Sequence, residues 1–348
     1  MTLRILALML SMILLTSCLG DGDDIEYSTS KPDTFPNPNS FEMILPVKNN
    51  DAVEADLERN ANIWQDAMNN SNTVNQLLKR DLGKMEILKL YPVTASNNAL
   101  TRWDLYSPIG GDSAVPRFTI RELASSDSKF DTAQSQYPQY EYTYQIHHED
   151  SPGSWVEFWV GTMVMSSSAN KTGSGSFFIN YIASNQTDPD NYKDTGSLQL
   201  SFSGSNENTH AMQLAFTNYK AKSNMADYLA LTDTFDYQMN TAEGDGHFYY
   251  AGKHDWTETD IPEKLNIYTD WNKAKIGQSQ MLVTGVDIDN KQLELVEIRE
   301  CWNAAFQETY YVQINRFKED VGDPTIQDER GDKNRCPYDF KDWQDLLD

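Results

Sequence analysis

Two spacings of apolar residues divide the chain. Between Val53 and Leu82 apolar side chains, Trp64 among them, recur every three to four residues, which is the spacing of one helix face. A polar run at 69–72 interrupts this pattern, so more than one helix is expected. From Glu86 onward the spacing changes to two, which is typical of strands with one buried face. The pattern therefore predicts N-terminal amphipathic helices followed by a long run of β-strands.

Short turns join the predicted strands. Gly, Asn, Asp and Ser lie between them, and only 224–231 offers a short candidate helix. Such connections favour an antiparallel meander over alternating β-α units. We therefore expect an α+β fold that is mainly antiparallel β, with N-terminal amphipathic helices packed on a long, curved meander. The predicted strands are 86–92, 100–106, 116–123, 140–148, 154–166, 176–183, 197–203, 210–218, 233–239, 246–251, 264–269, 280–288, 292–300 and 308–317.

The strand predicted at 154–166 is apolar on both faces. Trp155, Trp159 and Met163 fall on one side, and Phe158 falls on the other with three valines. Both faces of such a strand need a cover. The N-terminal helices provide one cover, and a second sheet, the curled sheet itself or an apolar ligand provides the other. Trp155, Trp159 and Met163 are therefore candidate ligand-binding residues.

The N-terminus has the features of an export signal. Arg4 is followed by a short apolar stretch, which is typical of a secretory signal peptide over residues 1–17. The stretch ends in Leu15-Thr16-Ser17-Cys18, which resembles the lipobox of bacterial lipoproteins. The resemblance implies that Cys18 becomes the acylated N-terminus, carrying palmitate-type chains. Because Leu19 follows instead of Asp, the resemblance favours the outer membrane, with the protein facing the periplasm or the cell surface.

Charge narrows the range of partners. The chain has 28 Lys and Arg against 52 Asp and Glu, a formal net charge of -24. Such a charge argues against nucleic acid and against electrostatic docking on anionic lipid. Residues 18–40 are acidic and then rich in Pro and Asn, which is typical of a tether, and residues 320–348 form an acidic tail. Between them, 41–319 is expected to form a single β-rich domain.

The two remaining cysteines suit a disulfide. With Cys18 acylated, Cys301 and Cys336 are left, and the export signal implies an oxidising compartment. One disulfide between them would tie the acidic tail to the domain; two buried free thiols are the alternative.

The order of these features resembles the LolA and LolB lipoprotein carriers. A lipobox, a tether, a helical region and an antiparallel meander with a doubly apolar centre share the architecture of those curved half-barrels, over roughly residues 50–317. The resemblance implies a half-barrel-like sheet whose concave apolar face suits acyl chains or another hydrophobic guest. It carries over no binding residue beyond the lipobox.

Motifs for catalysis are missing from the sequence. It contains no nucleophile elbow, zinc-protease helix or Cys/His ligand series. His247 and His254 flank a Tyr-rich strand and are the best candidates for a hydrolase or a zinc site. The favoured interpretation is a protein without enzymatic activity.

Oxygen-rich side chains collect in the tail. Asp320, Asp323, Asp328, Glu329 and Asp332 are the kind of ligands that Ca²⁺ takes, so a structural Ca²⁺ site is one hypothesis. A solvated acidic tail is the other, and no further cofactor is expected.

Aromatic clusters indicate a second kind of ligand. Tyr249, Trp256 and Trp271 lie in or near the Tyr-rich strand, with Asn and Asp close by in sequence. Aromatic rings beside polar groups suit sugar stacking, although Tyr and Trp also simply fill β-sheets well. The sequence thus predicts an outer-membrane lipoprotein that binds a hydrophobic ligand or an envelope partner. A glycan-binding surface is the alternative, and a hydrolase is a third hypothesis.

Overall fold

The protein was analysed as a computed structural model. It describes residues 41–47, 59–85, 90–96, 100–105, 113–124, 138–165, 173–206, 209–220, 233–240, 243–254, 263–285, 293–317, 324–343 and 346. All described residues belong to one compact unit, Pro32–Asp348.

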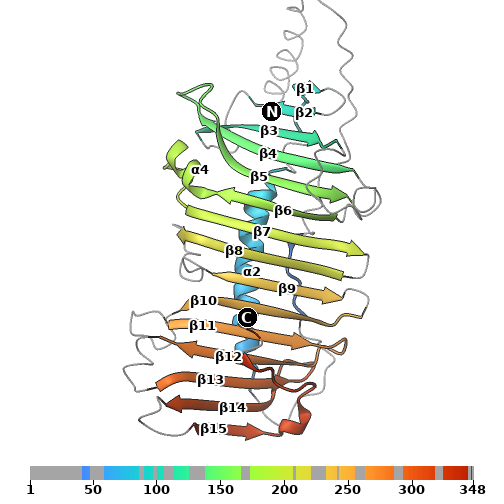
Figure 1. Cartoon of the computed structure of the whole chain (residues 1–348), viewed down its shortest axis with the longest axis vertical. Helices are drawn as coiled ribbons and strands as arrows, with labels where there is room; N and C mark the ends of the chain where they lie inside the picture. The colour runs from blue at the N-terminus through green and yellow to red at the C-terminus, as the bar shows by residue number, and fades with distance from the viewer. Residues whose placement is uncertain are drawn as a thin grey trace, which may run out of the picture. The chain divides into compact units, whose positions relative to one another are not determined.

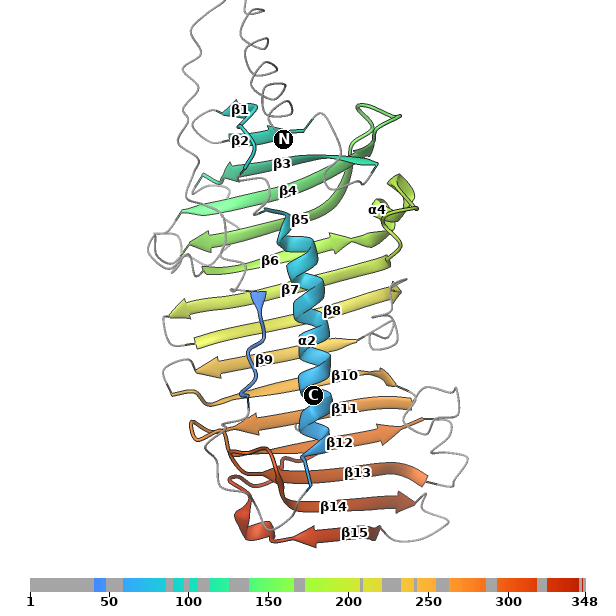
Figure 2. The same cartoon turned by 180° about the vertical axis from the view of Figure 1, so that it is seen from behind.

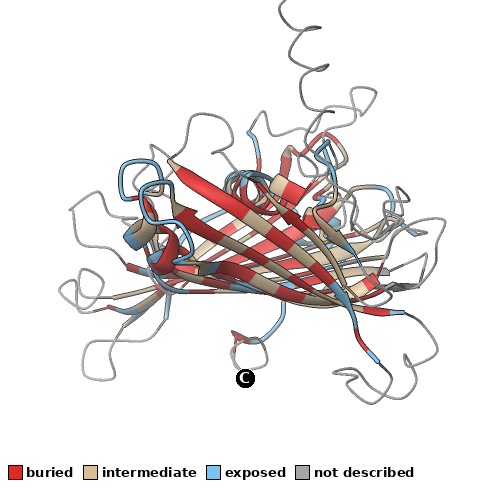
Figure 3. Cartoon of the chain, turned by 90° about the horizontal axis from the view of Figure 1, so that it is seen from above, coloured by how far each residue is buried: buried red, intermediate tan, exposed pale blue. Residues whose placement is uncertain are grey.

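One antiparallel sheet of 15 strands makes up most of this unit (Figure 1). Each strand pairs with its neighbours in the chain, so the order in space is the order in sequence. Successive strands are rotated relative to one another, as Figure 3 shows, which is the usual right-handed twist of large sheets. The strands are β1 (Ala95–Ser96), β2 (Leu100–Asp104), β3 (Ala114–Glu122), β4 (Gln139–His148), β5 (Val156–Met165), β6 (Gly173–Asn180), β7 (Thr195–Asn206), β8 (Thr209–Lys220), β9 (Thr234–Asn240), β10 (Gly246–His254), β11 (Glu263–Trp271), β12 (Gly277–Thr284), β13 (Leu293–Trp302), β14 (Glu308–Phe317) and β15 (Thr325–Gly331).

A single long helix, α2 (Asn62–Leu82), lies across one face of the sheet (Figure 2). We call this the inner face and the opposite one the outer face. The apolar stripe of α2 is buried against the sheet from Ile63 to Leu82. The predicted interruption at 69–72 is wrong, because α2 continues through it. Ser71 is buried in this stretch, and its hydroxyl donates to the Met68 carbonyl at 3.0 Å, so the polar side chain is satisfied inside the helix.

The two ends of α2 are held by side chains of the sheet region. Ala61 precedes the helix and offers no capping side chain. The Glu300 carboxyl group on β13 takes that role by accepting the Trp64 backbone N–H at 2.8 Å. At the other end, the Tyr181 hydroxyl donates to the Asp81 carboxylate at 2.9 Å, and Arg80 forms an ion pair with Asp194 at 2.7 Å.

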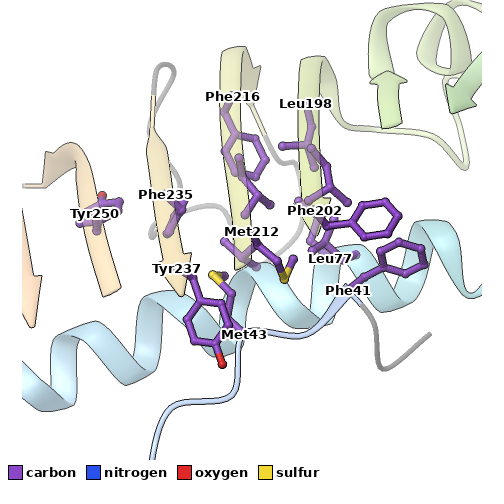
Figure 4. Close-up of a cluster of buried hydrophobic side chains, with 14 of the residues drawn as sticks. Phe41, Met43, Leu77, Leu198, Phe202, Met212, Phe216, Phe235, Tyr237 and Tyr250 are labelled. Carbon is purple, nitrogen blue, oxygen red and sulfur yellow. The ribbon is translucent and has the colours of Figure 1, made fainter. Parts of the chain in front are cut away.

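The segment 41–47 runs beside α2 on the same face and completes the cover (Figure 2). Figure 4 shows Phe41 and Met43 between the helix and the strands, close to Phe202 and Tyr237. The Phe41 and Phe202 rings meet edge to face at 4.9 Å, a favourable geometry for aromatic pairs. The apolar core therefore lies between the inner face on one side and α2 with this segment on the other.

The outer face is covered at its C-terminal end by the tail of the chain. Cys301 and Cys336 form the expected disulfide, which closes a loop with a sequence separation of 35. From there the tail crosses the outer face, where the side-chain amides of Gln278 and Gln280 donate to tail carbonyls at 3.1 and 2.9 Å. Trp343 packs on Tyr268 beyond them.

Most predicted strands are confirmed, as is the mainly antiparallel β class. At 86–92 the described part, 90–92, contains a turn and a bend instead of a strand. The last residues of the strand predicted at 176–183 begin a helix, α4 (Tyr181–Thr187), capped by the Asn180 side chain. The chain also forms β15 within the acidic tail, followed by a short 3-10 helix, η5 (Lys333–Arg335). The candidate helix at 224–231 lies outside the described residues.

None of the helices in the described part of the chain has the length and apolarity that crossing a bilayer requires.

Candidate functional site

The three residues predicted on strand 154–166 take different positions. Trp159 and Met163 point to the inner face and are fully buried, with Trp159 stacked on Tyr144 at 5.5 Å. Trp155 precedes β5 and is half-buried on the other side, between His147 and the Arg117 guanidinium. An apolar ligand that reached Trp159 or Met163 would therefore have to displace core side chains.

The aromatic residues predicted for sugar stacking are also divided. Trp271 is buried on the inner face, edge to face with Trp64 at 6.0 Å. Tyr249 lies on the outer face, where its hydroxyl donates to the Asn266 side chain at 3.1 Å. Trp256 lies outside the described residues.

The histidines and the tail acids do not converge. His247 and His254 sit at opposite ends of β10. In the tail, Asp328 pairs with Arg330, the Tyr310 hydroxyl donates to Glu329, and Asp332 caps η5. Asp320 and Asp323 lie outside the described residues. Within the described ranges, no three His, Cys, Asp or Glu side chains form a group that would hold a metal ion.

His247 instead lines a pocket on the outer face, at the junction of β9, β10 and β11. The pocket has a volume of about 390 Å³. Cross-strand pairing builds it, because Gln238 and Asp270 are the direct partners of His247 on the two neighbouring strands. The lining residues are Gln238, Asn240, Asp245, Gly246, His247, Tyr268, Asp270, Trp271 and Tyr338. We call this the His247 pocket.

Two carboxyl groups beside His247 have pKa values that are shifted in opposite directions. Asp236 lies 3.5 Å from the Nε2 atom of His247, and this contact lowers the pKa of Asp236. Burial raises the pKa of Asp270 to about 6, against the opposing charge of Lys341. The Oδ1 atom of Asp270 is buried, and the Tyr268 side chain interacts with this carboxyl group.

The tail supplies one wall of the His247 pocket. Tyr338 lies two residues after the disulfide at Cys336, is 40% exposed and lines the pocket. The His247 ring lies nearly parallel to that of Tyr268, with centroids 6.2 Å apart. The pocket thus combines aromatic surfaces with amide, carboxylate and imidazole groups. Such a set is chemically suited to a ligand that has both hydroxyl or amino groups and a flat apolar face.

Sequence reasoning identified His247 and Trp271 here but missed Asp236, Gln238, Asp270 and Tyr338. The strand register aligns Gln238 and Asp270 with His247, and the disulfide brings Tyr338 to the pocket. The alternation within 233–239 carried a partial signal, because it places Asp236 and Gln238 on the polar face, whereas Asp270 lies just beyond the strand predicted at 264–269.

No protein-family model matches the chain, and no curated protein or solved structure matches it either.

Proposed function

We propose that this chain is an exported, non-enzymatic lipoprotein, anchored in the outer membrane through Cys18, that binds a glycan in the His247 pocket. The anchor rests on the lipobox resemblance of Leu15-Thr16-Ser17-Cys18. The proposal of glycan binding rests mainly on one observation, the set of residues that lines the His247 pocket.

Sugars offer hydroxyl groups around an apolar ring face, and the pocket offers partners for both. Gln238, Asn240 and Asp270 supply amide and carboxylate groups for hydroxyls, and the exposed Tyr338 ring supplies a flat surface. A pocket of about 390 Å³ lies within the usual size range for small-molecule sites.

The hydrophobic-ligand function, with its half-barrel-like sheet and its resemblance to the LolA and LolB carriers, stays a prediction. The apolar inner face is already occupied by α2 and by the segment 41–47 (Figure 4). A lipid would have to separate these elements from the sheet. The glycan needs no such rearrangement, and for this reason we favour it.

Binding of the full chain, purified in detergent, to an array of neutral, amino and acidic oligosaccharides tests the proposal. We expect retention of at least one sugar class, and at least a tenfold loss of affinity in His247→Ala and in Tyr338→Ala. Lys253→Ala is the matched control, since Lys253 is exposed on the same face of β10 but lies outside the pocket lining. An array without retained sugars, or equal losses in the control, would contradict the proposal.

A further inference from the structure

Two further hollows lie on the outer face beside the His247 pocket. One, of about 330 Å³, lies over β7, β8 and β9 and shares Gln238 with the His247 pocket. The next, of about 370 Å³, lies over β4 to β7. Gln199 lines the second hollow and Ser201 the first, two residues apart on the same face of β7. The three depressions therefore follow one another across the strands.

A row of polar side chains connects them. Direct cross-strand pairing aligns one outward residue from each strand, β4 to β9. Hydrogen bonds run along the row, with Thr162 and Ser176 hydroxyls 3.4 Å apart and the Gln213 amide donating to Asp236 at 2.9 Å. From Asp236 the row reaches His247. We call it the polar ladder: Glu141, Thr162, Ser176, Ser201, Gln213 and Asp236.

The spacing of the ladder suits one class of polymer. Neighbouring strands lie about 4.8 Å apart, whereas an extended peptide advances about 3.3 Å per residue. A peptide laid across the strands would lose register with the ladder within a few residues. One pyranose in an extended glycan is close to the strand spacing in length, so successive sugars can meet successive strands.

The far hollow ends in an exposed ring. Phe178, on β6, is 43% exposed and lines the hollow together with Val160, while hydroxyl and amide groups surround them. This arrangement repeats the combination of ring and polar groups found at Tyr338 in the His247 pocket.

Charge selects among glycans. The linings of the three hollows contain Glu141, Glu157, Asp236, Asp245 and Asp270, and no Lys or Arg. Arg121 pairs with Glu141 at 2.9 Å and Lys341 faces Asp270, so the unneutralised acidic groups along the path are Glu157, Asp236 and Asp245. The path therefore keeps a negative charge, which repels a polyanionic glycan and attracts amino groups.

We infer that the outer face binds a linear, amino-bearing glycan along the polar ladder, from the His247 pocket to a second ring subsite at Phe178. The inference rests on the proposed glycan function and adds chain length, direction and charge to it.

Anisotropy titrations with fluorescent glucosamine disaccharide and hexasaccharide test it on the full chain in detergent. We expect the hexasaccharide to bind at least tenfold more tightly than the disaccharide. Phe178→Ala should remove this gain without changing disaccharide affinity, and Ile182→Ala, which removes an equally exposed apolar side chain on α4, should leave both affinities unchanged.

A second pair of variants tests the path itself. Ser201→Tyr fills the middle of the ladder and should bring hexasaccharide affinity down to that of the disaccharide. Thr217→Tyr adds the same bulk to an exposed position on the outer face of β8, outside the hollows, and should change nothing. An unfolding midpoint equal to that of the parent protein establishes that each variant is folded.

The outcomes separate the two proposals. Equal affinity for the two sugars, with binding that still requires His247, overturns the ladder and leaves the His247 pocket in place. Binding of neither sugar counts against the ladder, and failure of every sugar on the array overturns the proposed function as well. Tighter binding of oligogalacturonate than of glucosamine hexasaccharide overturns the charge assignment.

Discussion

The two faces of the sheet are made from the same strands but are covered in different ways. The inner face is buried along most of its length by α2 and the segment 41–47. The outer face is covered by the tail around β11 to β14, and from β4 to β10 it carries polar side chains and shallow hollows. Burial along the strands alternates accordingly (Figure 3). The comparison shows that most buried apolar contacts lie on the inner face. Side chains on the open part of the outer face can therefore vary, or contact a ligand, at little cost to stability.

The largest effect on stability should come from α2. Trp64 is buried between Trp302, Phe306 and Trp271. Trp64→Ala should lower the free energy of unfolding by about 3–5 kcal/mol, because a large cavity replaces a packed ring. Urea denaturation followed by circular dichroism measures the change. Gln65→Ala, one residue along on the exposed side of the helix, is the control and should cost under about 0.5 kcal/mol.

The second-largest effect on stability should come from the disulfide at the covered end of the outer face. Replacing Cys301 and Cys336 together with Ser should lower the free energy of unfolding by about 3–4 kcal/mol, from the loop-closure entropy of the unfolded chain. Because Tyr338 is then less firmly held, affinity for a disaccharide should fall as well. Loss of stability with unchanged affinity would show that the tail does not shape the His247 pocket.

A smaller effect on stability should come from Glu300, the buried acidic residue at the start of α2. Burial raises the pKa of Glu300 to about 8, although backbone N–H groups at the helix N-terminus oppose this. The folded state then binds a proton more tightly than the unfolded state between pH 4.5 and 8, so stability falls as pH rises through this range. The slope should approach about 1.4 kcal/mol per pH unit.

Glu300→Gln should remove this contribution while keeping an acceptor for the Trp64 N–H. Urea midpoints at pH 5, 6.5 and 8 would show a flatter profile than that of the parent protein. Glu294→Gln, an exposed position on the same strand, should leave the profile unchanged. A Glu300→Gln profile as steep as the parent's would argue against a protonated Glu300.

The smallest effect should come from the open part of the outer face. Tyr237 and Gln238 are neighbours on β9 that point to opposite faces. Gln238→Ala should change the free energy of unfolding by under about 0.5 kcal/mol, whereas Tyr237→Ala should cost several times more. Comparable losses in the two variants would contradict the division between the faces.

The sequence predicted the meander because alternation is a local property. Met212, Leu214 and Phe216 on β8 are inner-face residues, as their spacing indicates. Tyr181 and Ile182 misled the strand prediction because both are apolar and follow a strand directly, and only the Asn180 cap marks the helix. The exposed strand β15 was missed because its charged residues lack the alternation of a half-buried strand.

The site was less accessible to sequence reasoning because it depends on register and on distant segments. Asp270 lies opposite His247 because β10 pairs with β11. Tyr338 lies at the pocket because the disulfide holds the tail there. The sequence identifies His247 as a candidate, but the side chains that give it a pocket are set by these longer-range contacts.

The contact between Glu300 and the start of α2 has a consequence for the order of folding. Every strand needs only its sequence neighbour, so the sheet can extend step by step as the chain emerges during synthesis. Glu300, however, follows Trp64 by 236 residues. The first turn of α2 therefore waits through most of translation for its cap, and Trp64 waits as long for Trp302. Growth of the sheet is local and gradual, whereas closure of the core is a late event that depends on the thirteenth strand.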